Sequence, residues 1–353
     1  MSLTEMDNRE ITYAQALLEA VQQEMEADPS VYVFGLGVDD PIGMYGTTKD
    51  LHKKFGAHRN FDTPISEDSM TGVAIGSALA GMRPIHVHQR MDFLLLCMNQ
   101  LINVASKTSY MFGGEFSVPI VVRGIVGRSW GQGAQHSQSL QSLFMHIPGI
   151  KVVAPVTPYD AKGIMISSIR DNNPVVILEH RMLYKNLGHV PKESYELPFG
   201  SARSLSEGKD ITIVAISHMV IEAMEAMNLL KDKGITIDLI DPVSLSPLDI
   251  GSIVSSVEKT GKLLVVDNGW TSCGASAEII TQVIENLDNT SNYKFDRLGF
   301  ANTPCPTTKS LETLFYPNAQ SIAKKAYQLL TGLDDWNPIF KENKAVAKFK
   351  GPF

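Results

Sequence analysis

Cysteine is scarce in this chain, and the few cysteines that occur are far apart. The 353 residues include only Cys97, Cys273 and Cys305, and no two of them form a CxxC pair. This spacing argues against a structural zinc site. Isolated thiols are typical of proteins in a reducing compartment, so we expect a cytoplasmic location.

Long hydrophobic segments and long basic segments are also absent. No run reaches the roughly 18 apolar residues of a transmembrane helix, and the polar N-terminus MSLTEMDNREITYAQ does not resemble a signal peptide. The sequence has 31 lysines and arginines against 38 acidic residues, a net charge of −7 at pH 7. Such an acidic chain is a poor binder of phosphate backbones. We therefore expect neither a membrane nor a nucleic acid as a partner.

Apolar periodicity predicts that helices and strands alternate along the first half of the chain. Residues 12–26 have helical spacing, and VYVFG at Val31–Gly35 reads as a short buried strand. Further strands are expected at Pro84–His88, Val118–Arg123, Lys151–Ala154 and Pro174–Leu178, and further helices at 66–81, 92–111, 137–146 and 158–171. Thr157 followed by Pro158 is a helix start signal. This alternation favours a mainly parallel, helix-covered sheet.

The periodicity stops from about residue 183 to 203, where two prolines and two glycines indicate a linker. A second α/β series follows, with strands near 211–216, 235–240, 263–267 and 294–300, and helices near 219–233, 247–258, 274–287 and 319–330. Ser246-Pro247 again looks like a helix start. The sequence therefore predicts an α/β protein of two doubly wound domains. We expect these domains at 1–185 and 205–335, a linker at 186–204 and a basic tail at 336–353.

One candidate for chemistry is the segment DTPISE at Asp62–Glu67, which runs from a strand end into the small-residue helix MTGVAIGSALAG. Ser66 can cap this helix, which places Glu67 in its first turn. Ligands of open α/β sheets bind beyond the carboxyl ends of strands, so Glu67 lies where a site is expected. The alternative is a glutamate that only stabilises the helix dipole, and the spacing does not decide between the two.

The second candidate is His136, which closes a segment from Arg123 to Ser137 that has four glycines in 15 residues. Such a loop is pliable enough to cover a site, although a lone loop histidine can equally be a structural hydrogen-bonding group. His86 and His88 alternate along a predicted strand and suggest a metal site together with Asp92. Their spacing fits no firm ligand pattern, and two strand residues that share a face explain it better.

Several segments in a fixed order together resemble one known family. They are DTPISE, GMRPI, NQLINVASKTSYMFGG, VPIVVRG, GQGAQHSQS, GIKVVAP and SIRDNNPVVILE. The chain resembles the beta subunit of the thiamine-diphosphate-dependent first component of 2-oxo acid dehydrogenase complexes, of the pyruvate, branched-chain and acetoin types. The likeness covers about residues 10–330. It implies a transketolase-like pyrimidine-binding domain followed by a domain like the transketolase C-terminal domain.

The resemblance also implies roles for individual side chains. Glu67 matches the glutamate that hydrogen-bonds the aminopyrimidine ring and promotes the imino tautomer, whose nitrogen deprotonates the thiazolium carbon. Phe93 matches an aromatic side chain that packs against the same ring, and Gln89 lies in the stretch that covers the cofactor. His136 matches a histidine near the substrate and the incoming lipoyl group. A structural potassium ion of the family would be bound here by Ile120, Ser168, Ile169, Asp171 and Asn173, mostly through backbone carbonyls.

A GDG motif, which in thiamine enzymes marks the Mg²⁺ and diphosphate site, is missing from the sequence. The resemblance therefore implies half of a catalyst, with a separate alpha subunit that carries the GDG site and Mg²⁺. The expected activity is oxidative decarboxylation of a 2-oxo acid with acyl transfer to a lipoyl group. The expected assembly is an α2β2 heterotetramer around a beta dimer, with a lipoyl acyltransferase as a further partner. The alternatives are a two-subunit thiamine-dependent decarboxylase or carboligase, and a non-catalytic scaffold relative.

Two departures from the family pattern bear on the site. Leu36 follows the first strand where the family usually has an acidic residue of a proton relay between active sites, so this relay is in doubt. The segment His88–Phe93 replaces the usual methionine- and phenylalanine-rich stretch over the cofactor, and Gln89, Arg90 and the nearby Arg128 would make the pocket more polar. They indicate either a more polar 2-oxo acid as substrate or a variation in packing.

Overall fold

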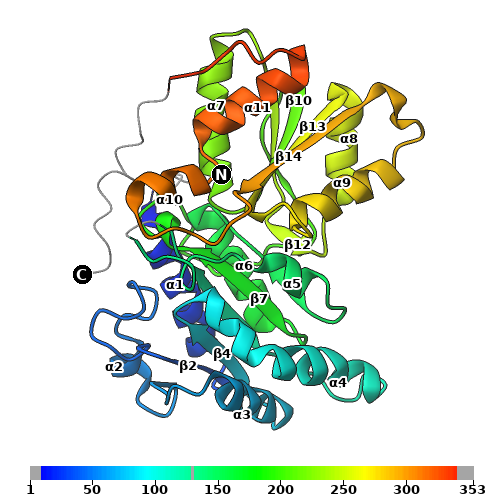
Figure 1. Cartoon of the computed structure of the whole chain (residues 1–353). Coiled ribbons are helices and arrows are strands. Elements are labelled where there is room, and N and C mark those ends of the chain that lie inside the picture. The colour runs from blue at the N-terminus through cyan, green and yellow to red at the C-terminus, as the bar shows by residue number, and fades with distance from the viewer. Residues whose placement is uncertain (1–8, 129–130, 340–353) are drawn as a thin grey trace, which may run out of the picture. The chain divides into compact units, whose positions relative to one another are not determined.

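The computed structural model describes residues 9–128 and 131–339 (Figure 1). The chain divides into two compact units. Unit 1 comprises Met1–Ile125 and Ile147–Phe199, and unit 2 comprises Val126–His146 and Gly200–Phe353. The segment Val126–His146, which the sequence analysis assigned to the first domain, thus has its main contacts in unit 2.

Unit 1 is built on a parallel sheet whose strands follow the order β6-β7-β5-β4-β2-β3. These strands are β2 (Val31–Gly35), β3 (Asn60–Phe61), β4 (Arg83–His88), β5 (Val121–Val126), β6 (Lys151–Val153) and β7 (Val175–His180). Every residue of β2, β5 and β7 is buried, as expected for a parallel sheet covered on both faces. A short antiparallel pair, β1 (Glu10–Thr12) with β8 (Leu187–His189), lies apart from this sheet.

The helices of unit 1 lie where the apolar periodicity predicts them, except for the short helix α2, which the sequence did not predict. They are α1 (Tyr13–Ala27), α2 (Leu51–Phe55), α3 (Glu67–Leu79), α4 (Ser106–Met111) and α6 (Pro158–Arg170). The start signal at Thr157 is confirmed, because its side chain accepts a hydrogen bond from the Asp160 backbone N–H at 3.0 Å. The helical stretch expected at 92–111 is confirmed, because every residue from 91 to 111 is helical. Its hydrogen-bonding pattern changes along the chain, from a 3-10 helix, η1 (Met91–Cys97), to a π-helix, η2 (Gln100–Ala105), and then α4.

A fully buried ion pair lies in the core of unit 1. Arg123 on β5 and Glu179 on β7 are both completely inaccessible to solvent, and the Arg123 Nη2 atom donates to Glu179 Oε2 at 2.9 Å. The hydroxyl group of Tyr184 donates to the same oxygen at 3.0 Å. Thr47 Oγ1 accepts from Arg123 Nη2 at 2.8 Å. The two buried charges therefore compensate each other and have further hydrogen-bond partners.

Unit 2 has a second sheet, with strands in the order β14-β13-β10-β11-β9. They are β9 (Arg203–Ser206), β10 (Ile211–Ala215), β11 (Ile237–Asp241), β13 (Lys262–Trp270) and β14 (Lys294–Phe300), and only β9 is antiparallel to its neighbour. The helices are α5 (Gln141–Met145), α7 (Met219–Lys231), α8 (Ile250–Thr260), α9 (Ala275–Glu285), α10 (Lys309–Phe315) and α11 (Ala319–Thr331). Short elements at Ser244–Ser246 (β12) and Thr290–Asn292 (η4) complete the unit.

Two helix starts in the molecule differ from the sequence prediction. Ser246-Pro247 is a cis peptide and not a helix start. Helix α8 begins at Ile250, where the Asp249 side chain accepts from the Ser252 N–H at 3.1 Å. Ser66 is the N-cap residue of α3, but its side chain makes no capping hydrogen bond. Both predictions relied on residue type alone, whereas capping requires a specific backbone and side-chain geometry.

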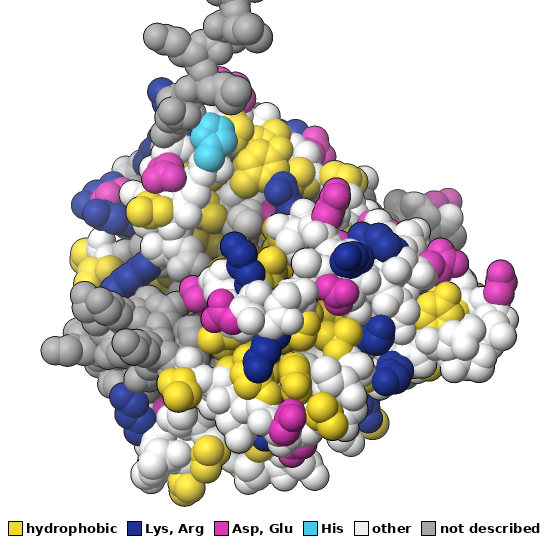
Figure 2. All heavy atoms as spheres, turned by 90° about the horizontal axis from the view of Figure 1, so that it is seen from above, with side chains coloured by type: hydrophobic (Ala, Val, Ile, Leu, Met, Phe, Trp, Pro, Cys, Tyr) yellow, Lys and Arg dark blue, Asp and Glu magenta, His cyan; other side chains and the backbone are white. Residues whose placement is uncertain are grey.

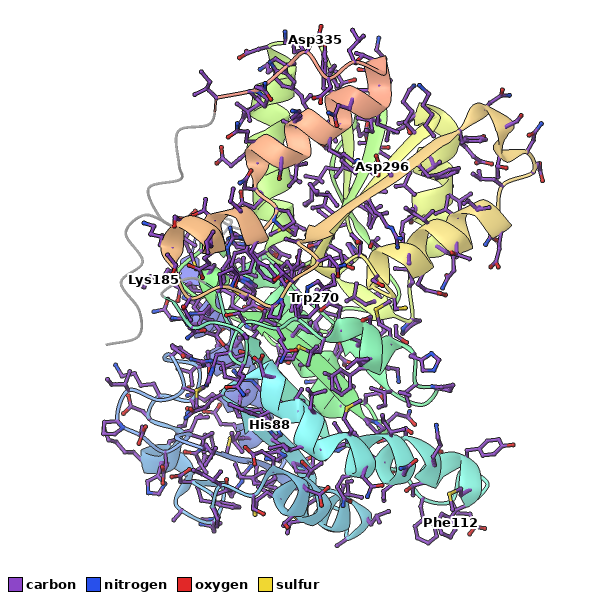
Figure 3. All side chains as sticks on the ribbon, in the orientation of Figure 1. His88, Phe112, Lys185, Trp270, Asp296 and Asp335 are labelled. Carbon is purple, nitrogen blue, oxygen red and sulfur yellow. The ribbon has the colours of Figure 1, made fainter. Side chains whose placement is uncertain are left out.

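An aromatic cluster joins the last strands of unit 2 to its C-terminal helices. Trp270, labelled in Figure 3, packs against a buried group formed by Phe300, Cys305, Phe315 and Tyr316. On the face drawn in Figure 2, basic and acidic side chains are interspersed among apolar ones. Within the described ranges, no helix is long and apolar enough to cross a membrane.

Candidate active site

A cavity of about 430 Å³ opens in unit 1 at the carboxyl ends of β2, β3 and β4. Its lining comes from Leu36 after β2, from Thr63–Glu67 after β3, from His86–Gln89 at the end of β4, and from Phe93 in η1. Parallel strands end at the same edge of a sheet, where the backbone turns into the following helices. The sheet topology therefore forms this cavity from segments that are distant in the sequence.

Three of the expected site residues line this one cavity. Glu67 is the first residue of α3, Gln89 directly follows β4, and Phe93 lies in η1. Glu67 is half-buried, whereas Asp68, the other acid in the first turn, is exposed. The positive end of the helix dipole favours a carboxylate at this position. The structure thus brings Glu67, Gln89 and Phe93 together.

The polar side of the cavity is held by hydrogen bonds to neighbouring loops. Gln89 Nε2 donates to the Leu36 carbonyl oxygen at 3.2 Å. Arg90 Nη1 donates to the Gln89 carbonyl oxygen at 2.6 Å and to the hydroxyl group of Tyr45 at 3.1 Å. Arg90 therefore supports the backbone at Gln89, and Gln89 is itself the polar side chain that lines the cavity.

His86 and His88 form a buried pair in the wall of the cavity, which sequence reasoning did not assign to the site. The ring nitrogens His86 Nδ1 and His88 Nε2 lie 3.2 Å apart, which confirms that the two residues share a face of β4. Burial lowers the pKa of His86 well below its ordinary value, and it lowers the pKa of His88 to about 3. Both rings are therefore neutral near pH 7. Their alternation along a strand that ends at the cavity was the available signal.

No group of three or more His, Cys, Asp or Glu side chains suited to an ion occurs among the described residues. Cys97 Sγ lies 4.0 Å from His88 Nε2, and burial raises the pKa of this thiol to about 12. The two rings and this thiol are thus uncharged near pH 7. With Phe93 and Met70 the rings form an apolar lining, and the Glu67 carboxylate is one of its few polar groups.

This lining suits a flat heterocycle that carries a few polar atoms. Small-molecule sites are mostly apolar, with a small number of placed polar groups that set the orientation of the ligand. Here Phe93 offers a ring face, and the Glu67 carboxylate and the Gln89 amide are two of the hydrogen-bonding groups in the lining. The residues present therefore fit the aminopyrimidine ring expected from the sequence.

His136 lies in unit 2, within the glycine-rich segment between β5 and α5. Gly131 and Gly133 have φ angles of +68° and +70°, which favour glycine. A Cβ atom on Gly133 would lie 2.6 Å from Thr307 Cγ2, so this part of the segment passes close to residue 307. The His136 side chain is half-buried. Ser129 and Trp130 of the same loop lie outside the described residues.

Arg128, which the sequence analysis placed near the cofactor, belongs to unit 2. Its guanidinium group is buried within unit 2, 3.6 Å from Glu222 Oε1 and 4.6 Å from the centre of the Tyr316 ring. The charge of Arg128 is therefore already paired with a carboxylate of its own unit.

The five residues expected to bind potassium lie around the C-terminal end of α6 and the starts of β5 and β7. The carbonyl oxygens of Ile169 and Asp171 both accept from Arg83 Nη1, at 2.9 and 3.0 Å. The Ile120 carbonyl oxygen accepts from the Val175 N–H at 3.0 Å. Ser168 lies in the last turn of α6, and the Asn173 N–H donates to Asp171 Oδ1 at 2.8 Å. A carbonyl oxygen has a second lone pair, and a helix C-terminus favours cations, so this group of carbonyls fits a cation.

Comparison with known proteins gives matches over nearly the whole chain. Residues 9–186 match the transketolase pyrimidine binding domain, and residues 200–322 match the transketolase C-terminal domain. The beta subunit of acetoin:2,6-dichlorophenolindophenol oxidoreductase from Cupriavidus necator is 42% identical over 92% of this chain and 98% of its own. The pyruvate dehydrogenase E1 component subunit beta of Porphyra purpurea is 45% identical over 84% of this chain and 90% of its own.

A solved structure agrees with the fold. The chain superimposes on a split-gene transketolase, described as an inactive beta4 tetramer, with a TM-score of 0.75 and 21% sequence identity. The match covers 91% of this chain and 98% of that chain. At this identity the likeness concerns the fold, and it confirms the predicted pair of α/β domains with mainly parallel sheets.

Proposed function

We propose that this chain is the beta subunit of a thiamine-diphosphate-dependent 2-oxo acid dehydrogenase. It belongs to the family of transketolase-like beta subunits that includes those of pyruvate dehydrogenase E1 and acetoin oxidoreductase. The observation that carries the proposal is the convergence of Glu67, Gln89 and Phe93 on one cavity at the carboxyl edge of a parallel sheet. An α/β fold alone would not single out these three side chains.

Glu67 is the acid–base group of the proposed site. The chemistry that thiamine diphosphate supplies when bound is addition to the carbonyl carbon of a 2-oxo acid and stabilisation of the negative charge left by departing CO₂. The Glu67 carboxylate shares a proton with a ring nitrogen, and its place in the first turn of α3 directs it into the cavity. Phe93 packs against the ring face, and the Gln89 amide orients the polar edge.

His136 is the second proton-handling group of the proposal. Its imidazole donates a proton or a hydrogen bond to the carbonyl oxygen of the substrate, which gains negative charge when the carbonyl carbon is attacked. The glycines on its N-terminal side allow backbone conformations that other residues rarely adopt, as the positive φ angles of Gly131 and Gly133 show.

The proposed assembly follows from what the chain does not carry. A GDG segment for Mg²⁺ and diphosphate is absent from the sequence, and the relatives are named as beta subunits. We expect a GDG-carrying alpha subunit, a beta dimer within an α2β2 tetramer, and a lipoyl acyltransferase as acyl acceptor. The unpaired state of all three cysteines is compatible with a cytoplasmic location for this assembly.

A potassium ion is the second cofactor that we propose, bound by carbonyls of Ile120, Ser168, Ile169, Asp171 and Asn173. The support is that the Ile169 and Asp171 carbonyls already converge on one cationic group, that of Arg83. Binding to the folded state alone raises the melting temperature. We expect a higher melting temperature in KCl than in NaCl of equal ionic strength, and equal values would contradict the proposal.

A carboligase of a secondary pathway is the alternative that one observation favours. Gln89 makes the cavity more polar than an apolar side chain would, and Leu36 lines it where an acidic residue of a proton relay is usual. The non-catalytic scaffold is less well supported, because both Glu67 and His136 are retained.

The test is to assemble the chain with its GDG-carrying alpha partner, thiamine diphosphate and Mg²⁺. Release of CO₂ from pyruvate, branched-chain and more polar 2-oxo acids is measured, followed by transfer of the acyl group to a lipoyl domain or to an aldehyde. Acyl transfer to the lipoyl domain is the expected result, and the isolated chain should show no turnover. Transfer to the aldehyde alone would favour the carboligase, and an inactive assembly would contradict both.

A further inference from the structure

We propose that unit 2 positions the side chain of His136 through two buried polar clusters, one before it and one after it in the segment Val126–His146. The Arg128 cluster consists of Arg128, His218, Glu222 and Tyr316. The Gln141 cluster consists of Ser139, Gln141, Asp267 and Asn268. Arg128 and Gln141 are thus positioning residues, and this inference rests on the role proposed for His136.

The Arg128 cluster holds the beginning of the segment. Arg128 is 7% exposed, and its Nη1 atom lies 3.1 Å from His218 Nδ1 and 3.6 Å from Glu222 Oε1. Burial and the neighbouring guanidinium group lower the pKa of His218 well below its ordinary value, so its ring is neutral and Nδ1 can accept the hydrogen bond. Glu222 Oε2 accepts from the backbone N–H of Ala319, the first residue of α11, at 2.9 Å. The loop is thereby tied to α7 and α11.

The Gln141 cluster holds the end of the segment, and its four side chains are at most 4% exposed. Gln141 Oε1 accepts from Ser139 Oγ at 2.7 Å, and Gln141 Nε2 donates to Asp267 Oδ1 at 2.7 Å. Asn268 Nδ2 donates to Ser139 Oγ at 3.2 Å. Asp267 Oδ2 accepts from the Ser276 N–H at 3.0 Å, in the first turn of α9. The start of α5 is thereby joined to β13 and α9.

The distance along the chain makes the Gln141 cluster the tighter of the two anchors. Ser139 is three residues from His136, whereas Arg128 is eight residues away across a stretch rich in glycine. Ser137, next to His136, is fully buried. A displacement of about 1 Å in a reacting group can lower turnover by about 10²-fold. A change in the Gln141 cluster should therefore reach the imidazole, although none of its members touches substrate in the proposed mechanism.

Moving the carboxylate of the Gln141 cluster from residue 267 to residue 141 distinguishes a role in positioning His136 from a general contribution to the stability of unit 2. Gln141→Glu places two carboxylates against each other at Asp267 and should displace the segment. Adding Asp267→Asn restores the pattern, because the asparagine amide can donate to the new glutamate while its carbonyl oxygen accepts from the Ser276 N–H. The glutamate can still accept from Ser139, and the net charge of the cluster stays the same. Gln282→Glu is the matched control, since it sets a carboxylate beside Glu278 on the exposed face of α9.

Turnover of the assembly with its alpha partner is measured for all four proteins, together with KM, cofactor affinity, melting temperature and hydrogen exchange of unit 2. For Gln141→Glu we expect kcat to fall about 10- to 100-fold with KM and cofactor affinity nearly unchanged, and faster exchange confined to residues 131–141. The double variant should recover most of the wild-type kcat, and the control should match wild type. Ser139→Ala, which removes one hydrogen bond, should show a smaller change of the same kind if Gln141→Glu does not fold.

Two outcomes would overturn the inference. One is a Gln141→Glu protein that folds and keeps wild-type kcat. The other is a loss of kcat that is accompanied by faster hydrogen exchange throughout unit 2 and is not recovered in the double variant. A failure of the proposed function is distinguishable from both, because the wild-type assembly would then be inactive, and local exchange in the isolated chain would still decide whether the cluster holds the segment.

Discussion

Units 1 and 2 each hold one of the two proposed proton-handling side chains, but by different means. Glu67 is the first residue of a regular helix, so the backbone of α3 and the preceding turn determine its position. His136 lies in a loop whose two ends are held by Glu222 of α7, Asp267 of β13 and the ring of Tyr316. A group at a helix terminus can thus be positioned by local structure, whereas a loop group needs partners from distant parts of the chain.

The two units also differ in how they accommodate buried charge. Unit 1 buries the Arg123–Glu179 ion pair between two strands of its sheet. Unit 2 buries Asp267 against neutral donors, and its carboxylate accepts from the Gln141 amide and the Ser276 N–H. Burial therefore raises the pKa of Asp267 to about 6. The consequence is that the units should respond in opposite directions to acid, as described below.

The largest expected effect concerns Glu67, with its neighbour Asp68 as a matched control. Glu67→Gln keeps the shape of the side chain but cannot accept a proton, so turnover should fall by about 10²- to 10⁴-fold, or about 3–5 kcal/mol. Asp68→Asn should leave turnover nearly unchanged, because this side chain is exposed and does not line the cavity. Both changes should cost about 0.3–1 kcal/mol through the helix dipole.

Steady-state turnover and exchange of the cofactor's thiazolium proton are the measurements for this pair. Equal activity of the two variants would mean that Glu67 only stabilises α3, and unit 1 would then hold no acid–base group.

The next largest effect concerns the stability of unit 1. Arg123→Met leaves the Glu179 carboxylate buried without its partner, which should lower the free energy of unfolding by about 3–5 kcal/mol. Lys53→Ala is the control, because the Lys53–Asp50 pair is exposed and should contribute less than about 1 kcal/mol. Denaturant unfolding followed by hydrogen exchange in β5 and β7 measures both. A loss of protection centred in unit 2 would show that the two units do not unfold separately.

His136→Ala should lower turnover by about 10²-fold or somewhat more, a smaller effect than that of Glu67→Gln. Affinity for the cofactor and the stability of unit 2 should remain close to wild type, because the anchoring clusters are intact. Gln135→Ala, at an exposed neighbouring position, is the control. Single-turnover and steady-state rates of the assembly test this expectation, and a wild-type rate for His136→Ala would return the residue to a structural role.

The smallest effect is a difference in pH dependence between the units. The pKa of His88 is about 3 in the folded chain against an ordinary value of 6.5. Its contribution to stability is present above pH 6.5 and is lost progressively as the pH falls toward 3. His88→Phe should therefore make unit 1 less sensitive to acid.

Asp267 should act with the opposite sign in unit 2. Its pKa is about 6 when folded against an ordinary value of 3.8, so its contribution is present below pH 3.8 and is lost as the pH rises through 6. Asp267→Asn should remove this loss. Melting temperatures of both variants are measured between pH 4 and pH 8 and compared with wild type. If the difference from wild type changes with pH in the same direction for both variants, the opposite roles of His88 and Asp267 are contradicted.

Sequence patterns predicted the elements well where local signals are strong. Strand Val31–Gly35 and strand 294–300 have the expected limits, and α6 begins at Pro158 as its start signal indicates. The strand expected at Val118–Arg123 lies instead at Val121–Val126, and the helix expected at 137–146 begins only at Gln141. Apolar runs show that an element exists, but hydrogen bonding to neighbouring strands and loops decides its limits.

The sequence by itself determined the alternating α/β architecture, the two-domain family and the place of Glu67 at a helix start, because each follows from residues close together in the chain. Only the tertiary structure decided that Gln89 and Phe93 line the same cavity as Glu67 and that His86 and His88 form part of its wall. It likewise decided that Arg128 pairs with Glu222 and that Gln141 bonds Asp267. These partners are far apart in sequence, and no local periodicity encodes which side chains the topology of the sheets brings into contact.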